Sequence, residues 1–103
     1  MHSTLVTIGC FSPEGATSFA QYARGVLPLI AESGGTIVTR LFPRETVVGD
    51  SERQPDLIAV IQFQSEHQLR DFITSPQYLQ HVPNRDRAFA WLRSYIADEA
   101  PTP

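Results

Sequence analysis

The pattern of apolar positions along the chain predicts four strands. Residues 5–11, 36–42, 57–63 and 92–97 are short apolar or β-branched runs bounded by glycine, proline or polar residues, as is typical of strands. In the third run, five successive positions from 57 to 61 are apolar. A strand of that kind is covered on both faces of its sheet.

Helical periodicity separates these strands. Over residues 19–30 the apolar side chains recur at helical spacing, and Gly34–Gly35 provide a C-terminal stop. Two starts remain open for this helix, a Ser-Pro pair at 12–13 and a Thr-Ser pair at 17–18. Pro28 lies inside the pattern, where it removes one backbone hydrogen bond.

A second helical region follows the third strand. Ser65 and Gln68 form a capping box, which predicts that a helix begins there. A Ser-Pro pair at 75–76 predicts a further turn through Gln80, and Pro83 predicts a last short helix through Ala88.

The longest connection is the segment 43–55, which is rich in proline and charge. Two interpretations stay open: a long hairpin, or an excursion in which residues 46–48 extend as strand. Its length makes it the best candidate for a mobile or partner-contacting loop.

The element order β-α-β-β-α-β predicts an α+β ferredoxin-like fold, with both helices on one face of a four-stranded antiparallel sheet. We expect one domain over residues 1–98 and a frayed tail at 99–103. The helices leave the other face of an apolar sheet bare, so we expect a homodimer in which two such sheets pack together.

The composition of the chain limits the classes of partner that we expect it to bind. The chain has 103 residues, is 42% hydrophobic and 18% charged, and carries a formal net charge of -3. That charge argues against nucleic acid as a partner, because no basic stripe is available to neutralise phosphates. The sequence has no apolar run that would span a bilayer and no signal peptide, so we expect a cytoplasmic protein without a membrane partner.

Composition also removes several kinds of chemistry. All eight basic residues are arginines, which excludes an amine nucleophile. Cys10 lies in an apolar strand and is interpreted as a small hydrophobe. The three histidines lack metal-ligand spacing, and no glycine-rich loop leads from a strand into a helix, so we expect neither a metal nor another cofactor.

Three polar residues remain as catalytic candidates. His81 is the best candidate for an acid or base near neutral pH, and Tyr78 lies three positions before it on the same predicted turn. Arg40, inside a strand, is a candidate clamp for an acidic or enolic oxygen. For His81 a surface position is the alternative, and for Arg40 a salt bridge to Glu45 or Asp56.

An ordered set of features runs through nearly the whole chain. They are Phe19-x-x-Tyr22, Pro28, Gly34-Gly35, Arg40, Gly49-Asp50, Ile61-x-Phe63-x-Ser65, Ser75-Pro76-Gln77-Tyr78 and Arg85. In these features the chain resembles the dimeric α/β-barrel superfamily, and within it a small bacterial family of unknown function. More distantly it resembles the antibiotic-biosynthesis monooxygenases, which oxidise polycyclic phenols without flavin or metal. It departs from those enzymes at Phe63 and Phe72, where they commonly carry Trp and His.

The resemblance implies a homodimer with a ligand pocket in each subunit between sheet and helices. The residues expected to bind a substrate there are Tyr22, Phe19, Phe63, Phe72 and Arg85. For Tyr22, a place in an ordinary amphipathic core is the alternative.

Two functions from different classes follow. The first is a cofactor-independent tailoring enzyme, of the cyclase, isomerase or monooxygenase type, acting on an aromatic or polyketide-like metabolite of secondary metabolism such as antibiotic biosynthesis. The second is a non-catalytic dimeric protein that binds a small molecule or serves as an accessory. Both need an apolar pocket with a few polar anchors.

Overall fold

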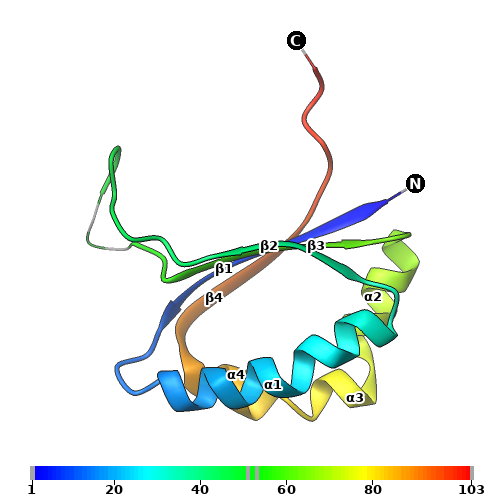
Figure 1. Ribbon diagram of the computed structural model, residues 1–103, viewed down its shortest axis with the longest axis horizontal. Coiled ribbons are helices and arrows are strands. Elements are labelled where there is room, and N and C mark those ends of the chain that lie inside the picture. Colours follow the sequence, from blue (N-terminus) through cyan, green and yellow to red (C-terminus); the bar gives the residue numbers. More distant parts are fainter. Residues whose placement is uncertain (1, 51, 53, 103) are drawn as a thin grey trace.

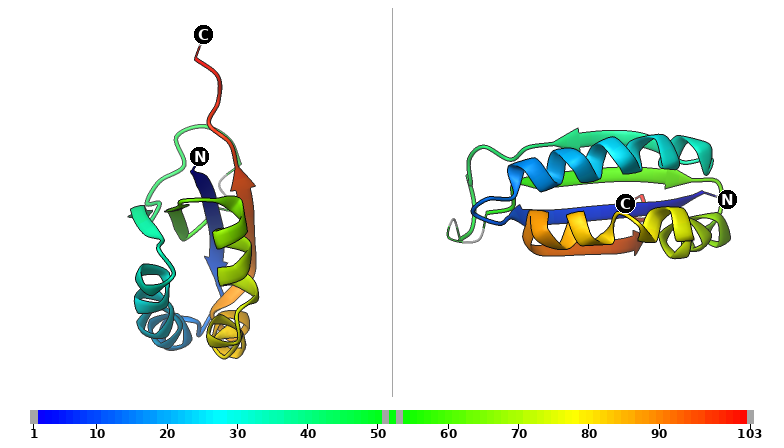
Figure 2. Two further views of the ribbon diagram at one scale, coloured as in Figure 1. Left: turned by 90° about the vertical axis from the view of Figure 1, so that its right-hand side faces the viewer. Right: turned by 90° about the horizontal axis from the view of Figure 1, so that it is seen from below.

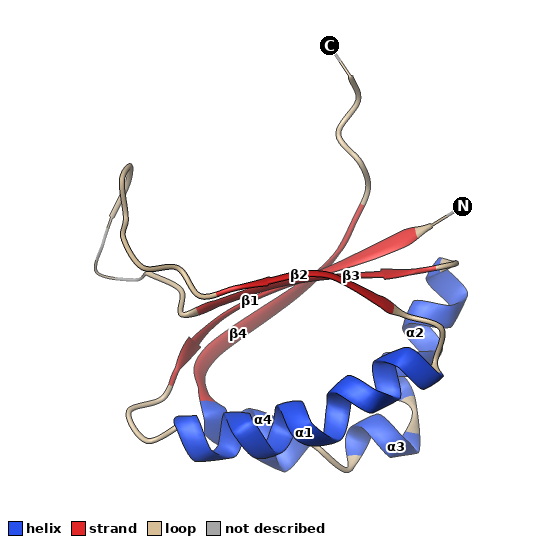
Figure 3. Ribbon diagram, viewed as in Figure 1, coloured by secondary structure: helices blue, strands red, loops and turns tan. Residues whose placement is uncertain are grey.

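The computed structural model describes residues 2–50, 52 and 54–102. Within these residues, four strands and four helices follow one another (Figures 1 and 3). In order they are β1 (Ser3–Phe11), α1 (Ala16–Glu32), β2 (Thr36–Leu41), β3 (Leu57–Phe63), α2 (Glu66–Thr74), α3 (Pro76–Leu79), α4 (Val82–Ala88) and β4 (Phe89–Ala97).

The strands form one antiparallel sheet in the order β2-β3-β1-β4. All helices lie on the same face of this sheet, α1 in one row and α2 to α4 in the other (Figure 2). The predicted α+β ferredoxin-like fold is therefore confirmed.

Three of the predicted helix boundaries are confirmed, two by a capping hydrogen bond and one by a backbone conformation. The Ser65 hydroxyl accepts from the Gln68 amide at 3.1 Å and caps α2, and the Ser75 hydroxyl caps α3 by accepting from the Tyr78 amide at 3.1 Å. Past the end of α1, Gly34 adopts a φ of 81°, a conformation that favours glycine.

Both predicted starts of α1 are wrong, because the helix begins at Ala16 with Gly15 as its N-cap and no side-chain cap. Ser12 is used elsewhere: its amide donates to the Ala88 carbonyl at 2.9 Å and its hydroxyl to the Arg87 carbonyl at 2.7 Å. The residue that resembled a cap ties the start of α1 to the end of α4 instead.

Other predicted bounds differ as well: β1 begins at Ser3, not at residue 5, and β2 ends at Leu41, not at residue 42. β4 begins at Phe89, not at residue 92, because α4 runs directly into the strand and Phe89 pairs with Phe11 across a register shift in β1. Residues 46–48 do not extend as strand. In the segment between β2 and β3, the Thr46 hydroxyl instead donates to the Gln54 side chain at 2.6 Å.

The core between sheet and helices consists of two clusters. The α2-side cluster comprises the buried residues Leu5, Val26, Ile30, Ile61, Phe63, Leu69, Phe72 and Tyr78. The α4-side cluster comprises Leu57, Ala88 and Phe89, with Phe11, Phe19 and Leu92 packed against them. The hydrophobic interior is thus built at two ends of the molecule.

No helix of the described part of the chain covers the opposite face of the sheet (Figure 1). In β3 the residues on the helix side are buried, whereas the alternating residues Ile58, Val60 and Gln62 are only half-buried. Leu41 and Tyr95, on the edge strands, are 52% and 48% exposed. We call this bare, largely apolar surface the outer face.

A tight contact at the start of α1 gives a test of the fold. A Cβ at Gly15 would collide with the backbone carbonyl of Ala88 and with the Ser12 hydroxyl. Because a backbone carbonyl cannot move aside cheaply, we expect Gly15→Ala to lower the free energy of unfolding by about 1–3 kcal/mol. Urea denaturation measures the change, and Thr17→Ala, at an exposed position of the same helical turn, is the control, expected within about 0.5 kcal/mol of wild type. Equal stability of the two variants would contradict the contact.

Candidate functional site

A pocket of about 400 Å³ lies between the sheet and the helices, a volume within the range of small-molecule sites. It separates the two core clusters and takes side chains from both. Its principal residues are Leu5, Thr7, Phe19, Tyr22, Val26, Ile30, Ile37, Arg40, Leu57, Ala59, Ile61, Phe72, Tyr78, Arg85, Phe89, Leu92, Ser94 and Ile96. Most of these side chains are aliphatic or aromatic, so the pocket favours an apolar ligand.

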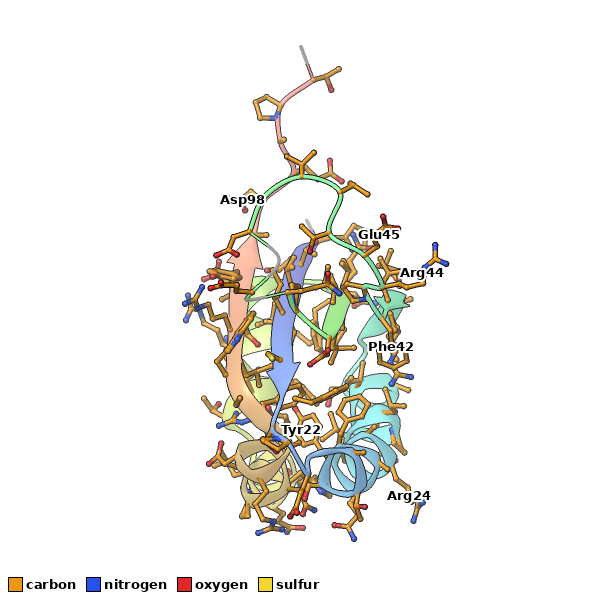
Figure 4. The ribbon with its side chains drawn as sticks, turned by 90° about the vertical axis from the view of Figure 1, so that its left-hand side faces the viewer. Tyr22, Arg24, Phe42, Arg44, Glu45 and Asp98 are labelled. Carbon is orange, nitrogen blue, oxygen red and sulfur yellow. The ribbon has the colours of Figure 1, made fainter. Side chains whose placement is uncertain are left out.

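Two tyrosines and an arginine from three helices meet at the wall of this pocket. The hydroxyls of Tyr22 and Tyr78 are 2.8 Å apart, and Arg85 donates from Nη1 to the Tyr78 hydroxyl oxygen at 3.2 Å. The two rings stand edge to face, with centroids 6.3 Å apart. Tyr22 points into the space beneath the sheet, whereas Arg24 of the same helix points away (Figure 4).

The direction of this hydrogen-bonded chain is fixed at one end, because arginine can only donate. The tyrosines hold two hydroxyl hydrogens, and the contact between them uses one. Among the described residues no acceptor is recorded for the other. One phenolic hydrogen is therefore left for a ligand oxygen, and the neighbouring guanidinium polarises it.

The hydroxyl of Tyr22 stays protonated at physiological pH. Burial, and after it the neighbouring Tyr78, raises the pKa of Tyr22 well above its ordinary value of 10.0, although Arg85 opposes this. Burial lowers the pKa of Arg85, but the hydrogen bond to Tyr78 and the Asp86 carboxylate outweigh it, so the net direction is upward. The cluster thus holds a donor and a cation, and neither is a proton acceptor.

Arg40 lies at the opposite side of the pocket, on edge strand β2. Arg40 pairs with Ala59 of β3, and Ile37 pairs with Ile61. These two β2 residues are three positions apart, so a regular strand would direct their side chains to opposite faces of the sheet. A register shift between Ile37 and Thr39 turns both toward the pocket.

The predicted alternative, a salt bridge from Arg40 to a carboxylate, does not occur among the described residues. Asp56 instead accepts a hydrogen bond from the Phe11 amide at 2.8 Å. The Arg40 side chain is exposed at the rim.

Two of the predicted site residues lie outside the pocket lining. The His81 ring packs against Gly25 of α1, in the space that a Cβ would occupy, and Phe63 is 1% exposed in the α2-side cluster. The catalytic role of His81 stays a prediction without a contact to the pocket. Phe19 and Phe72 do line the pocket, at opposite ends.

Sequence reasoning missed the hydroxyl pair at the sheet side of the pocket. Thr7 of β1 and Ser94 of β4 are 2.9 Å apart through their side-chain oxygens and both line the cavity. Thr7 lies two positions after Leu5 on the same strand and therefore on the same face of the sheet, which is the only indication of its place in the sequence. The register that brings Ser94 opposite is set by tertiary pairing.

Within the described part of the chain, the residues that line the pocket include no histidine, carboxylate or thiol. Cys10 is not among them, and burial together with Asp56 raises the pKa of its thiol. The polar groups of the described lining are therefore hydroxyl and guanidinium groups, which can donate hydrogen bonds to a ligand oxygen.

The chain belongs to the family described as a domain of unknown function, DUF1330, whose model matches residues 7–98. A comparison of the sequence with curated proteins found no match. No helix among the described residues is long and apolar enough to cross a membrane.

Solved structures share the fold. A protein of unknown function from Rhodopseudomonas palustris is similar with a TM-score of 0.85 and 18% identity, over 98% of this chain and 84% of that one. The cofactor-independent oxygenase SnoaB from Streptomyces nogalater has a TM-score of 0.69 and 15% identity, over 98% and 95%. A dimeric ferredoxin-like protein of unknown function from Bacteroides fragilis has a TM-score of 0.66 and 6% identity, over 95% and 96%.

The raised pKa of Tyr22 predicts how stability depends on pH. Above pH 10.0 an unfolded chain releases this proton while the folded chain keeps it, so the free energy of unfolding falls as the pH rises, by up to about 1.4 kcal/mol per pH unit. Tyr22→Phe removes this dependence. Urea denaturation between about pH 8 and pH 11 gives the slope of the free energy of unfolding against pH for each protein. Both proteins carry Cys10→Ala, because the pKa of the Cys10 thiol is raised as well. Parallel curves would show that Tyr22 titrates normally.

Proposed function

We propose that the protein is a cofactor-independent tailoring enzyme whose substrate is a small aromatic or polyketide-like metabolite with an acidic enol or phenol. The observation that carries this proposal is the Tyr22–Tyr78–Arg85 cluster, a polarised donor at the wall of an apolar pocket of about 400 Å³. The fold shared with a cofactor-independent oxygenase supports it as an analogy.

The chemistry follows from what the pocket contains. The aromatic part of the substrate lies between Phe19 and Phe72, and its oxygen accepts the remaining phenolic hydrogen. As the substrate loses a proton to water, negative charge grows on that oxygen. The tyrosine hydroxyl that donates this hydrogen, together with Arg85, stabilises the charge as an oxyanion hole does.

The absence of a base from the described lining limits the reactions available. The substrate must itself be acidic enough to ionise when its anion is stabilised. An enolate formed in this way reacts with dioxygen or an internal electrophile, which gives oxidation, isomerisation or cyclisation. For anthrone, a tricyclic ketone that enolises to a phenol, reaction with an equal amount of dioxygen gives anthraquinone and water.

The lack of a base among the described lining residues also favours a second candidate function. A pocket that stabilises an anion but holds no proton acceptor in its described lining also suits a protein that binds an acidic aromatic ligand without converting it. The two functions differ in turnover and share the binding step, so one experiment separates them.

The experiment measures anthrone binding under argon and dioxygen consumption under air. We expect Tyr22→Phe and Tyr78→Phe to lower kcat by about 100-fold, because each breaks the donor chain, and to change the anthrone Kd far less. Tyr95→Phe, in which the exposed tyrosine of β4 loses its hydroxyl, is the matched control and keeps its rate. Binding without oxygen consumption in the wild type supports the second candidate. Absence of binding contradicts both.

We further propose that two copies pack through their outer faces as a homodimer. The half-buried apolar residues of β1 and β3 and the exposed Leu41 and Tyr95 lie on that face. A second copy would cover them, since an apolar sheet face is stable when it packs on another layer. The dimeric neighbour of the same fold supports this assembly.

The oligomeric state tests the assembly directly. Val60→Glu places an unpaired charge in the centre of the outer face, and we expect it to shift the protein from dimer to monomer in light scattering at micromolar concentration. Gln21→Glu adds the same charge at an exposed position on α1 and leaves the dimer unchanged. A wild-type monomer, or a dimer that survives Val60→Glu, would contradict an interface at this face.

A further inference from the structure

A second hollow of about 400 Å³ adjoins the main pocket. It is formed by α4 and the adjoining strand β4, with Asp86 and Trp91 among its residues. Arg85, Phe89 and Ser94 line both cavities. The two spaces are therefore neighbours that share a wall, and Arg85 is the charged part of that wall.

Arg85 uses its guanidinium in two directions. Nη1 donates to the Tyr78 hydroxyl at 3.2 Å, while Nε and Nη2 both face one oxygen of Asp86 at 3.4 Å. These last contacts are long for charge-assisted hydrogen bonds. The Asp86 side chain is 66% exposed, and ion pairs at such exposed positions contribute little.

We propose that the second hollow is a carboxylate-binding subsite. The aromatic part of the ligand occupies the main pocket, and a carboxylate on it reaches the shared wall and binds Nε and Nη2 of Arg85 in place of Asp86. The inference rests on the proposed function, because it presupposes that the main pocket holds the ring. Beyond the proposed function, the subsite requires that the ligand carry a carboxylate in addition to its aromatic ring.

The geometry suits a carboxylate better than a neutral group. Nε and Nη2 of an arginine present two parallel donors that match the two oxygens of a carboxylate, whereas Asp86 presents a single oxygen to both. Arg85 is the only cation among the described residues of the second hollow.

Asp86 is then an internal competitor. It neutralises the guanidinium in the free protein and must leave when the ligand binds. Because the Asp86 side chain is exposed and its contacts to Arg85 are long, this displacement weakens ligand binding only by about two- to fivefold. Removal of the Asp86 charge is therefore expected to strengthen the binding of an anion, the opposite of the effect of removing Arg85.

Two ligands of nearly equal shape test the subsite. 2-Naphthoate carries a carboxylate, and 2-naphthamide replaces it with a neutral amide on the same ring. Isothermal titration calorimetry at low ionic strength gives the ratio of their dissociation constants. We expect the wild type to prefer 2-naphthoate by about tenfold. Arg85→Gln reduces this preference to about one, and Arg85→Lys retains part of it, because lysine keeps the charge without the fork.

Two further variants complete the test. Asp86→Asn raises the preference by about two- to fivefold, and Arg87→Gln leaves it unchanged, since Arg87 lines neither cavity. Equal affinity for both ligands in the wild type, or an undiminished preference in Arg85→Gln, would overturn the subsite and leave the proposed function standing. Failure of both ligands to bind would overturn the proposed function together with the subsite.

Discussion

Two groups of aromatic rings keep the helices away from the sheet. At one end the rings of Phe11, Phe19 and Phe89 pack in tilted and edge-to-face arrangements, with centroids 4.8–5.9 Å apart. At the other, Phe72 lies 5.5 Å from Phe63 and 5.2 Å from Tyr78. The pocket lies between these two groups and is lined mainly by aliphatic side chains of the sheet and of α1. Its position thus follows from how the core is packed.

This construction gives the site its chemical character. Most of the pocket wall consists of core residues, and a hydrogen bond or charge beside such a wall is stronger than in bulk water. The few polar groups, the tyrosine pair with Arg85 and the hydroxyl pair on the sheet, are consequently placed where they have large effects. They are all suited to holding electron-rich oxygen. Under the proposed function, the protein supplies affinity for an anion and the reactivity comes from the substrate.

Much of the fold could be predicted from the sequence, because caps, glycines and apolar periods are local signals. Ser65 and Ser75 cap the helices that they were expected to cap. Ser12 has the same local signal but bonds to the end of α4, since tertiary contacts outweigh a cap worth about 1 kcal/mol. The site was less predictable. The resemblance indicated Tyr22, Tyr78 and Arg85 individually, but their contact depends on how three helices pack.

The register shift in β2 has a consequence for how this site can change. Alternation along a regular strand would send Ile37 and Arg40 to opposite faces, and the extra residue between them turns both inward. The face on which this charge lies is therefore set by the count of residues in an edge strand. Loss or gain of a single codon there would move the arginine between the ligand pocket and the outer face, which no point substitution at this position achieves.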